Sequence, residues 1–220
     1  MQLKAAIFDM DGLLIDSEPL WQEAGRETLA ELGYHLTLEQ YHTSTGLRTE
    51  EWIEHWFHYF GIDLRYAPAA VATILKKAIE KIEARGTVFP GATAAIEQFQ
   101  TAGYRVGIAT SSPMELVEVV LPKLQLAKPP QAIASAGALP YGKPHPQVYL
   151  NCAADLEVHP LQCIAFEDSF NGMIAAKAAR MKCVVVPAPA DYDAPKWQAA
   201  DLKLPSLAGM QLAELLQQLA

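Results

Sequence analysis

The sequence predicts an α/β protein whose parallel sheet carries helices on both faces and receives an all-helical block after its first strand. From residue 87 onward, short apolar runs alternate with helical patterns, as in parallel sheets. Residues 17–86 instead show helical spacing of their apolar side chains and no strand pattern. We therefore expect an α/β core of residues 1–16 and 87–220 and a helical cap of residues 17–86.

The first strand is predicted over residues 5–8, an apolar run typical of a strand that is buried on both faces. Asp9 and Asp11 follow it, and side chains two residues apart on an extended chain point the same way. Two converging carboxylates repel each other, and a bound cation would relieve this repulsion. Carboxylate oxygens suit Mg²⁺. The pattern also fits a polar strand end that enters a turn, where Gly12 lets the backbone bend sharply.

The inserted block is predicted to be helical throughout. One helix is expected to begin near Asp16 or Ser17 and to end before Gly33. Two further apolar stripes, within residues 49–60 and 71–82, repeat at helical spacing. Their aromatic residues could line a ligand groove, but stripes with this spacing are usually the core of a helix bundle.

The rest of the core is predicted as alternating helices and strands. Strands are expected at residues 104–109, 132–134, 162–166 and 183–186, and helices at 91–102, 113–123, 145–156, 170–181 and 206–219. Ligands of such sheets bind beyond the carboxyl ends of the strands. Asp9 and Asp11 lie at that edge, and a block inserted there would cover the site as a cap.

Three polar motifs follow later strands or precede helices. Thr110 and Ser111 end one strand, where a hydroxyl and free backbone N–H groups suit a phosphate oxygen, although helix capping explains them equally well. Lys143 lies between a turn and a helix, where its ammonium could neutralise phosphate, although a lone lysine is usually solvated. Glu167 and Asp168 end another strand and could complete a metal site or simply form a polar turn.

Composition narrows the class of protein. Hydrophobic residues make up 51% of the 220 residues, enough for a sizeable core, and the formal net charge is −8. This charge argues against nucleic acid and anionic membranes as main partners. No apolar run approaches the roughly 18 residues of a membrane helix, and no signal peptide is visible. Three cysteines without a C-x-x-C pair are expected to be reduced and buried, so we expect a cytoplasmic protein.

In this order, the D-x-D motif, threonine, lysine and Glu-Asp pair make the chain resemble the haloacid dehalogenase superfamily of phosphatases and phosphomutases, with a Rossmann-like core and a helical cap. The resemblance spans essentially all 220 residues. Residues 139–150 and 166–187 look most like bacterial sugar-phosphate phosphatases, in particular the hexitol and 2-deoxyglucose 6-phosphate phosphatases, which are relatives of β-phosphoglucomutase. The resemblance implies an Mg²⁺-dependent phosphatase that acts on small hexose, hexitol or 2-deoxyglucose 6-phosphates.

The resemblance also implies roles for single residues. Asp9 would be the nucleophile that becomes an aspartyl-phosphate, and Asp11 would be the general acid and then the general base. Thr110 and the Ser111 backbone would hold phosphate oxygens, and Lys143 would balance their charge.

The expected metal ligands are the Asp9 carboxylate, the Asp11 carbonyl and Asp168. Glu167 is not expected to bind the metal directly, but to orient a metal-bound water or Lys143. In the cap, the Gly46-Leu47-Arg48 segment stands where relatives carry an arginine that touches the substrate, so Arg48 either binds substrate or is a surface charge. Nothing in the sequence demands a protein partner, and we expect a monomer.

Other functions remain open at this stage. β-Phosphoglucomutases carry a histidine where this chain has Trp21, which favours a phosphatase over a phosphomutase. A phospho-receiver module also combines acids, a hydroxyl and a lysine, but its phospho-accepting aspartate lies on a middle strand. The helical block between the two halves of the core is hard to explain in a receiver, whose loops are short. A degenerate, non-catalytic binding protein is the third alternative.

Overall fold

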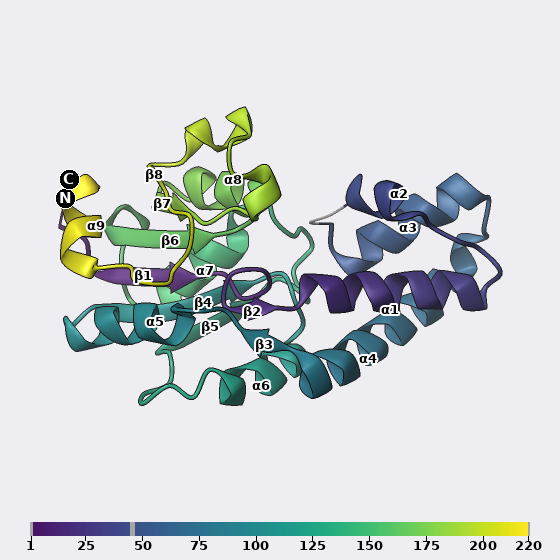
Figure 1. The fold of residues 1–220 in the computed structure, drawn as a ribbon, viewed down its shortest axis with the longest axis horizontal. Coiled ribbons are helices and arrows are strands. Elements are labelled where there is room, and N and C mark those ends of the chain that lie inside the picture. Colours follow the sequence, from purple (N-terminus) through teal and green to yellow (C-terminus); the bar gives the residue numbers. More distant parts are fainter. Residues whose placement is uncertain (1, 45–46, 220) are drawn as a thin grey trace. The chain divides into compact units, whose positions relative to one another are not determined.

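The computed structural model describes residues 2–44 and 47–219, and the chain divides into two compact units. The first unit contains residues 1–16 and 88–220, and the second contains residues 17–87 (Figure 1). Thr87, expected in the core, groups with the helical unit instead.

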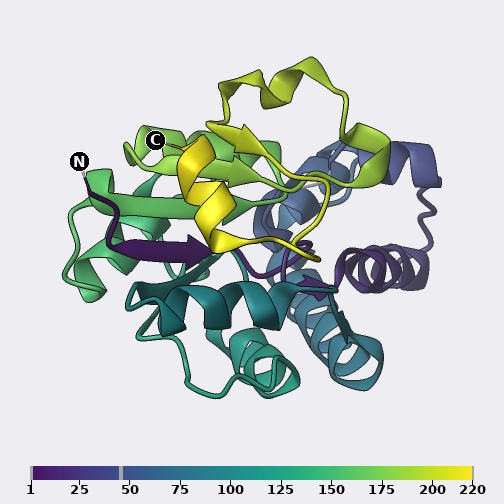
Figure 2. The same cartoon turned by 60° about the vertical axis from the view of Figure 1, so that its left-hand side comes forward.

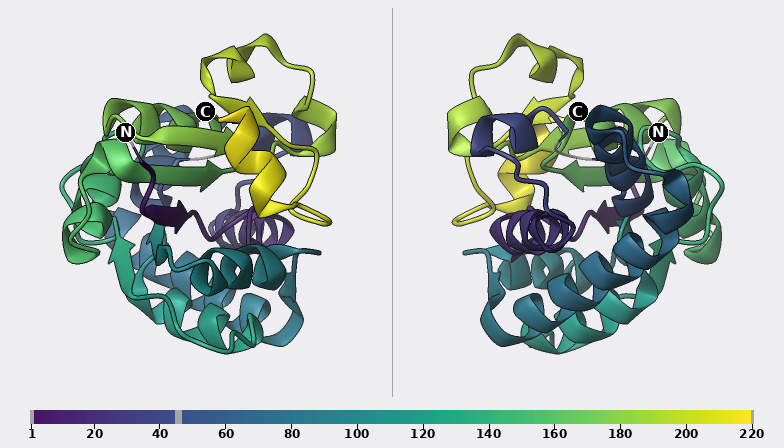
Figure 3. Two further views of the ribbon diagram at one scale, coloured as in Figure 1. Left: turned by 90° about the vertical axis from the view of Figure 1, so that its left-hand side faces the viewer. Right: turned by 90° about the vertical axis from the view of Figure 1, so that its right-hand side faces the viewer.

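The first unit is built on a parallel sheet of six strands in the order β5-β4-β1-β6-β7-β8. The strands are β1 (Ala5–Phe8), β4 (Arg105–Thr110), β5 (Ala132–Ser135), β6 (Cys163–Glu167), β7 (Lys182–Val185) and β8 (Leu202–Lys203). The strands all run in the same direction, as their parallel pairing requires (Figures 1 and 3). Their carboxyl ends therefore share one edge of the sheet.

Strand β1 occupies the middle of the sheet because it pairs with β4 on one side and β6 on the other. All four of its residues are fully buried, as a strand covered on both faces requires. Its side chains alternate between the two faces. Ala5 and Ile7 join the core beneath helices α7 (Gln147–Asp155) and α8 (Phe170–Ala178).

The opposite face of the sheet is packed with aromatic rings. The ring of Phe8 on β1 stacks on that of Phe166 on β6, with centroids 4.6 Å apart. Phe99 of helix α5 (Ala92–Thr101) meets both rings edge-on. Helix α9 (Leu212–Gln218) packs beside α5 (Figure 2), and the Gln98 side chain bonds the chain at Met210 and Leu212. Helix α6 (Met114–Lys123) follows β4.

The second unit consists of helices α1 (Glu18–Glu31), α2 (Leu38–His42), α3 (Thr49–Phe60) and α4 (Ala67–Arg85). The apolar stripe of α3, which includes Trp52 and Trp56, is buried in this unit. The prediction of a helix-bundle core is therefore confirmed for these aromatic residues. The Trp56 indole N–H donates to Ser44 Oγ at 3.0 Å.

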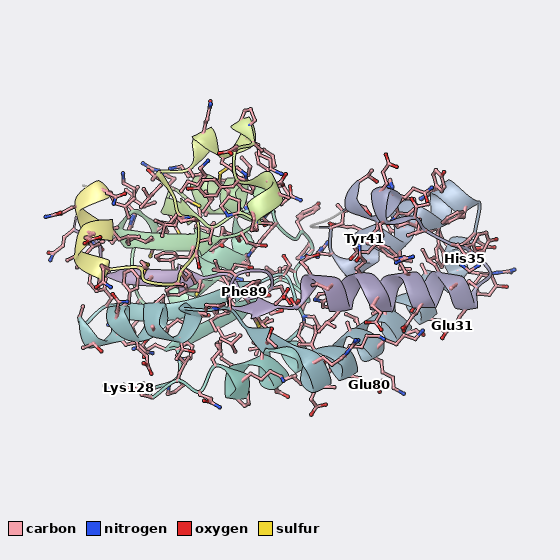
Figure 4. All side chains as sticks on the ribbon, viewed as in Figure 1. Glu31, His35, Tyr41, Glu80, Phe89 and Lys128 are labelled. Atoms are coloured by element: carbon pink, nitrogen blue, oxygen red, sulfur yellow. The ribbon has the colours of Figure 1, made fainter. Side chains whose placement is uncertain are left out.

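Ion pairs join α1 to α4 along one side of the helical unit. Lys81 reaches Glu23 and Glu27 on α1, each at 2.9 Å, and Lys77 reaches Glu31 at 2.7 Å. Glu31 is labelled in Figure 4. The glutamates of these pairs are partly open to solvent, and ion pairs of this kind add little stability one by one, so packing of the apolar faces holds the helices together.

The largest differences between the predicted and the observed elements lie at three places. Helix α8 ends at Ala178 rather than residue 181, because Arg180 adopts a left-handed backbone conformation with φ of 66°. The last helix begins at Leu212 rather than residue 206, because Gly209 turns the chain with φ of 74°. Strand β8 and the small sheet of β2 (Ile15–Asp16) and β3 (Thr87–Val88) were not predicted. Each of these strands has only two residues, too few to show the alternation of apolar and polar side chains that predicts a strand.

The cysteines and the helices were expected to be those of a protein without disulfides and without membrane-spanning segments. All three cysteines are buried and unpaired. Among the described residues, no helix combines the length and the apolar character needed to cross a bilayer.

Gly107 on β4 lets α7 pack closely on the sheet, and this close packing leads to a testable prediction. A Cβ atom at position 107 would lie 2.5 Å from Cys152 Sγ and 3.2 Å from Leu156 Cδ1. We expect Gly107→Ala to lower the free energy of unfolding by about 1–3 kcal/mol, because overpacking forces the helix away from the sheet. The measurement is urea denaturation followed by circular dichroism. The double variant G107A/C152A should recover part of the loss, and equal losses in both variants would contradict this explanation.

Candidate functional site

The carboxyl edge of the sheet collects the polar residues predicted from the sequence. Asp9 follows β1, Thr110 ends β4, and Glu167 ends β6 with Asp168 directly after it. Lys143 comes from the segment between β5 and α7. Because neighbouring parallel strands end at the same edge, these residues meet although they are far apart in the sequence.

A buried ammonium group lies at the centre of the site. The Lys143 side chain is 5% exposed and donates to Asp9 Oδ1 at 2.5 Å and to Glu167 Oε1 at 2.6 Å. A third bond goes to the carbonyl oxygen of Ala109 at 2.9 Å. An ammonium has three protons, so each of them has an acceptor in this arrangement.

For both Lys143 and Asp9, burial and the nearby charges of opposite sign shift the pKa in opposite directions. Burial lowers the pKa of Lys143, but the negative charges of Asp9 and Glu167 outweigh it, so that its pKa lies above the usual value. Burial raises the pKa of the Asp9 carboxyl to about 8, and the positive charge of Lys143 opposes the rise. Lys143 is therefore a lasting positive charge, whereas Asp9 needs more positive charge nearby to stay ionised.

Glu167 is fully buried and held at both carboxylate oxygens. Its Oε1 accepts from Lys143 and, at 2.6 Å, from the Tyr149 hydroxyl. Its Oε2 accepts from the Ser169 backbone N–H at 3.3 Å and hydroxyl at 3.0 Å. The carboxylate lies directly over Gly172, where a Cβ atom would come within 1.9 Å of Oε1. The space for Glu167 therefore depends on a residue without a side chain in the first turn of α8.

The acidic residues of the site suit a divalent cation. Asp9, Glu167 and Asp168 each offer a carboxylate oxygen, and these oxygens lie within 4.8 Å of one another. Of these three carboxyl groups, those of Asp9 and Glu167 share the Lys143 ammonium, so the negative charges of the cluster outnumber the positive charge that the structure shows bonded to them. Oxygen donors and a deficit of positive charge are what Mg²⁺ requires. These residues could therefore hold Mg²⁺, with Glu167 either as a ligand or as the partner of Lys143.

Gly12 brings the two acidic segments together. Its backbone has φ of 78°, a conformation that suits glycine, so the sharp turn expected after the D-x-D motif is present. A Cβ atom at this position would lie 2.1 Å from Asp168 Oδ2. A side chain here would therefore force Asp168 out of its place.

The Asp11 carboxylate accepts hydrogen bonds from two hydroxyl groups. Its Oδ2 accepts from Ser112 Oγ at 2.7 Å and from Thr110 Oγ1 at 3.4 Å. Thr110 Oγ1 also accepts from the Ser112 backbone N–H at 3.0 Å. At 3.4 Å the contact of Thr110 with Asp11 is long, so its single hydroxyl proton could go to a phosphate oxygen instead.

Ser112 and Tyr149 touch the site although they were not predicted to do so. Ser112 belongs to the same Thr-Ser-Ser run as Thr110, so its hydroxyl could have been considered from the sequence. Tyr149 lies in the first turn of α7, six residues after Lys143, where an apolar pattern gives no sign of a polar contact.

The cap residues singled out by the sequence belong to the helical unit. Arg48 precedes α3 and forms an ion pair with Glu51 at 3.1 Å, and its side chain is 14% exposed. Gly46, from the same predicted segment, lies outside the described residues. Trp21 is half-buried on α1. The core residues gather without these cap residues, and Arg48 binding substrate stays a prediction.

The sequence was also compared with protein families, known proteins and solved structures. Residues 3–180 match the family model described as haloacid dehalogenase-like hydrolase. The chain is 44% identical over 216 residues to hexitol phosphatase B of Escherichia coli strain K12, covering 98% of this chain and 97% of that protein. It is 29% identical over 185 residues to the phosphorylated carbohydrates phosphatase of Thermotoga maritima, covering 80% and 82%.

The fold is shared with a solved structure as well. The crystal structure of β-phosphoglucomutase from Clostridium difficile matches 99% of this chain and 97% of its own with a TM-score of 0.87. At 21% identity this likeness shows the fold alone. This match extends over both the sheet and the inserted helices described above. The chain therefore belongs to the haloacid dehalogenase-like hydrolase family, in which it is a phosphatase.

Proposed function

We propose that the protein hydrolyses phosphate monoesters of small sugars, with hexose, hexitol or 2-deoxyglucose 6-phosphate as substrate, Mg²⁺ as cofactor and an aspartyl-phosphate as intermediate. The observation that carries the proposal is the buried Asp9 carboxylate, which lies 2.5 Å from the Lys143 ammonium and within reach of Asp168. The relatives named hexitol phosphatase and phosphorylated carbohydrates phosphatase support the class of substrate.

In the first step, a carboxylate oxygen of Asp9 attacks the phosphorus atom and the bond from phosphorus to the sugar oxygen breaks. Asp11, protonated beforehand, gives its proton to the leaving sugar oxygen. Ser112, which bonds Asp11 at 2.7 Å, fixes the direction of that carboxyl group. The free sugar and an aspartyl-phosphate on Asp9 result.

In the second step, Asp11 takes a proton from a water molecule, whose oxygen attacks the phosphorus atom. The bond between phosphorus and Asp9 then breaks, which restores the Asp9 carboxylate and releases inorganic phosphate. Asp11 is protonated again at the end of this step and can serve the next substrate. One residue thus acts as acid and then as base.

The charged groups of the site make the attack possible, because a carboxylate and a phosphate dianion repel each other. Mg²⁺ held by Asp9, Asp168 and the Asp11 carbonyl would supply positive charge that stabilises the phosphoryl oxygens. Lys143 adds a second positive charge. Once Asp9 is esterified it accepts the Lys143 proton less well, so that proton can turn to a phosphoryl oxygen. Thr110 and the Ser111 backbone bind the remaining oxygens.

Phosphomutase activity is the second candidate, since the fold is also that of a β-phosphoglucomutase. Trp21 stands where the sequence of those enzymes has a histidine, and this favours water over a second sugar as phosphoryl acceptor. Arg48 is proposed to contact the substrate from the helical unit.

The experiment that tests the proposal is phosphate release from 2-deoxyglucose 6-phosphate and a panel of hexose and hexitol phosphates with Mg²⁺. We expect Asp9→Asn to lower kcat/KM at least about a thousandfold, because the nucleophile is lost. Asp155→Asn, at the exposed end of α7, is the matched control and should keep normal turnover.

Each other outcome has a clear meaning. Conversion of β-glucose 1-phosphate to glucose 6-phosphate without release of phosphate would identify a phosphomutase. Stable phosphorylation of Asp9 without turnover would point to a receiver module. No turnover of any ester would point to a binding protein.

Removal of the metal gives a further prediction. EDTA should abolish phosphate release and added Mg²⁺ should restore it. Asp168→Asn should raise the Mg²⁺ concentration for half-maximal activity at least about tenfold, or about 1.4 kcal/mol, because one carboxylate ligand is lost. The exposed Asp193→Asn variant serves as the control. Full activity in EDTA would rule out the proposed cofactor.

Ser112 is expected to matter through Asp11. Ser112→Ala removes the 2.7 Å hydrogen bond to the Asp11 carboxyl, and kcat should fall about 10- to 100-fold because hydrogen bonds to charged groups contribute about 1.5–3 kcal/mol. The measurement is steady-state turnover, with Ser206→Ala, between β8 and α9, as the same chemical change at another serine. An unchanged kcat would show that Asp11 does not need this bond.

A further inference from the structure

We propose that the hydroxyl of Tyr149 is a positioning group for Lys143, acting through the Glu167 carboxylate that both residues share. The inference rests on the proposed function, because it assigns Tyr149 a part in the charge balance of the same site. The hydroxyl of Tyr149 bonds Glu167 and not Asp9, the proposed nucleophile. Its effect on Asp9 passes through the Lys143 ammonium, which bonds Asp9 directly.

The first observation is a shared acceptor. Glu167 Oε1 accepts from the Tyr149 hydroxyl at 2.6 Å and from the Lys143 ammonium at 2.6 Å. The phenol is the donor of its bond and the carboxylate oxygen is the acceptor. Two donors on one oxygen occupy different lone pairs. The phenol therefore restricts where around Oε1 the ammonium can lie.

The second observation is a direct contact. The Lys143 Nζ lies 5.0 Å from the centroid of the Tyr149 ring, within the range of a cation–π interaction. The ring thus bounds the ammonium on one side, while Asp9 and the Ala109 carbonyl accept its other protons. The ring of Tyr149 therefore contacts the Lys143 ammonium, and its hydroxyl bonds the Glu167 carboxylate that holds this ammonium.

The third observation is that both the tyrosine and its acceptor are rigid. Tyr149 is fully buried in the core between α7 and the sheet. Glu167 is held at Oε2 by Ser169 and rests on Gly172. A hydroxyl in such a place is costly unless it is bonded, and phenylalanine would fill the same volume without that cost. The presence of tyrosine therefore indicates that the hydroxyl is used.

The function of this arrangement follows from the number of protons on the ammonium. All three protons of Lys143 are taken by protein acceptors, and one of them must turn to the phosphoryl group during the reaction. If Glu167 is free to rotate, it can pull the ammonium away from Asp9. Tyr149 prevents this by holding Oε1 where the ammonium still reaches the Asp9 oxygen.

The test compares the wild-type protein with Tyr149→Phe, which keeps the ring and removes only the hydroxyl. We expect kcat/KM to fall about 10- to 100-fold, as for other groups that orient an active-site residue from behind. The dissociation constant of inorganic phosphate, measured by calorimetry in the presence of Mg²⁺, should rise at least about threefold. Tyr104→Phe, the same change beside Phe99, is the control and should alter neither value.

A double-variant cycle shows whether the effect passes through the lysine. If it does, Tyr149→Phe should change phosphate affinity less than twofold in a Lys143→Arg background, because the ammonium that the hydroxyl positions is no longer there. Equal losses in both backgrounds would overturn the proposal.

A lower melting temperature with unchanged phosphate affinity and kcat/KM would also overturn it, because Tyr149 would then be purely structural. Phosphate affinity is measured without turnover. If the wild-type protein releases no phosphate from any ester, the proposed function fails, whereas the role of Tyr149 is still decided by the affinity measurements.

Discussion

The buried ion pairs of Lys143 are the constraint on which the site depends. Taking an ammonium and two carboxylates out of water is expensive, and the expense is offset only when every proton finds a well-placed acceptor. Asp9, Glu167 and the Ala109 carbonyl provide those acceptors from three neighbouring strands. Because the acceptors come from β1, β4 and β6, the ammonium can be satisfied only when the centre of the sheet is correctly paired.

Small residues create the room that these charged groups occupy. Gly172 leaves space for the Glu167 carboxylate, and Gly12 leaves space for Asp168. Gly107 on β4 lets α7 approach the sheet closely, and the same helix carries Tyr149 to Glu167. Packing in the core and polar contacts at the edge are therefore linked, since a displaced α7 would move the hydroxyl that bonds the Glu167 carboxylate.

The local charge of the site differs from the charge of the whole chain. The protein carries a formal net charge of −8, yet its proposed substrate is an anion. At the edge of the sheet, the lysine and a divalent cation held by Asp9 and Asp168 can make the local field favourable to phosphate. The carboxylates proposed to hold the cation are also those that make this edge of the sheet acidic. Binding of the proposed metal would turn this acidic cluster into a site for an anionic ligand.

The sequence by itself determined the α/β core, the helical insertion and the residues of the motifs, because apolar periodicity and motif order are local properties of the chain. It placed the start of the last helix too early, at residue 206 rather than Leu212, since the turn at Gly209 depends on how the chain packs rather than on periodicity. Only the tertiary structure decided that Lys143 joins Asp9 to Glu167 and that Tyr149 and Ser112 hold these acids. Those contacts join residues on different strands and loops, and their distances are set by strand order and packing, which no spacing in the sequence records.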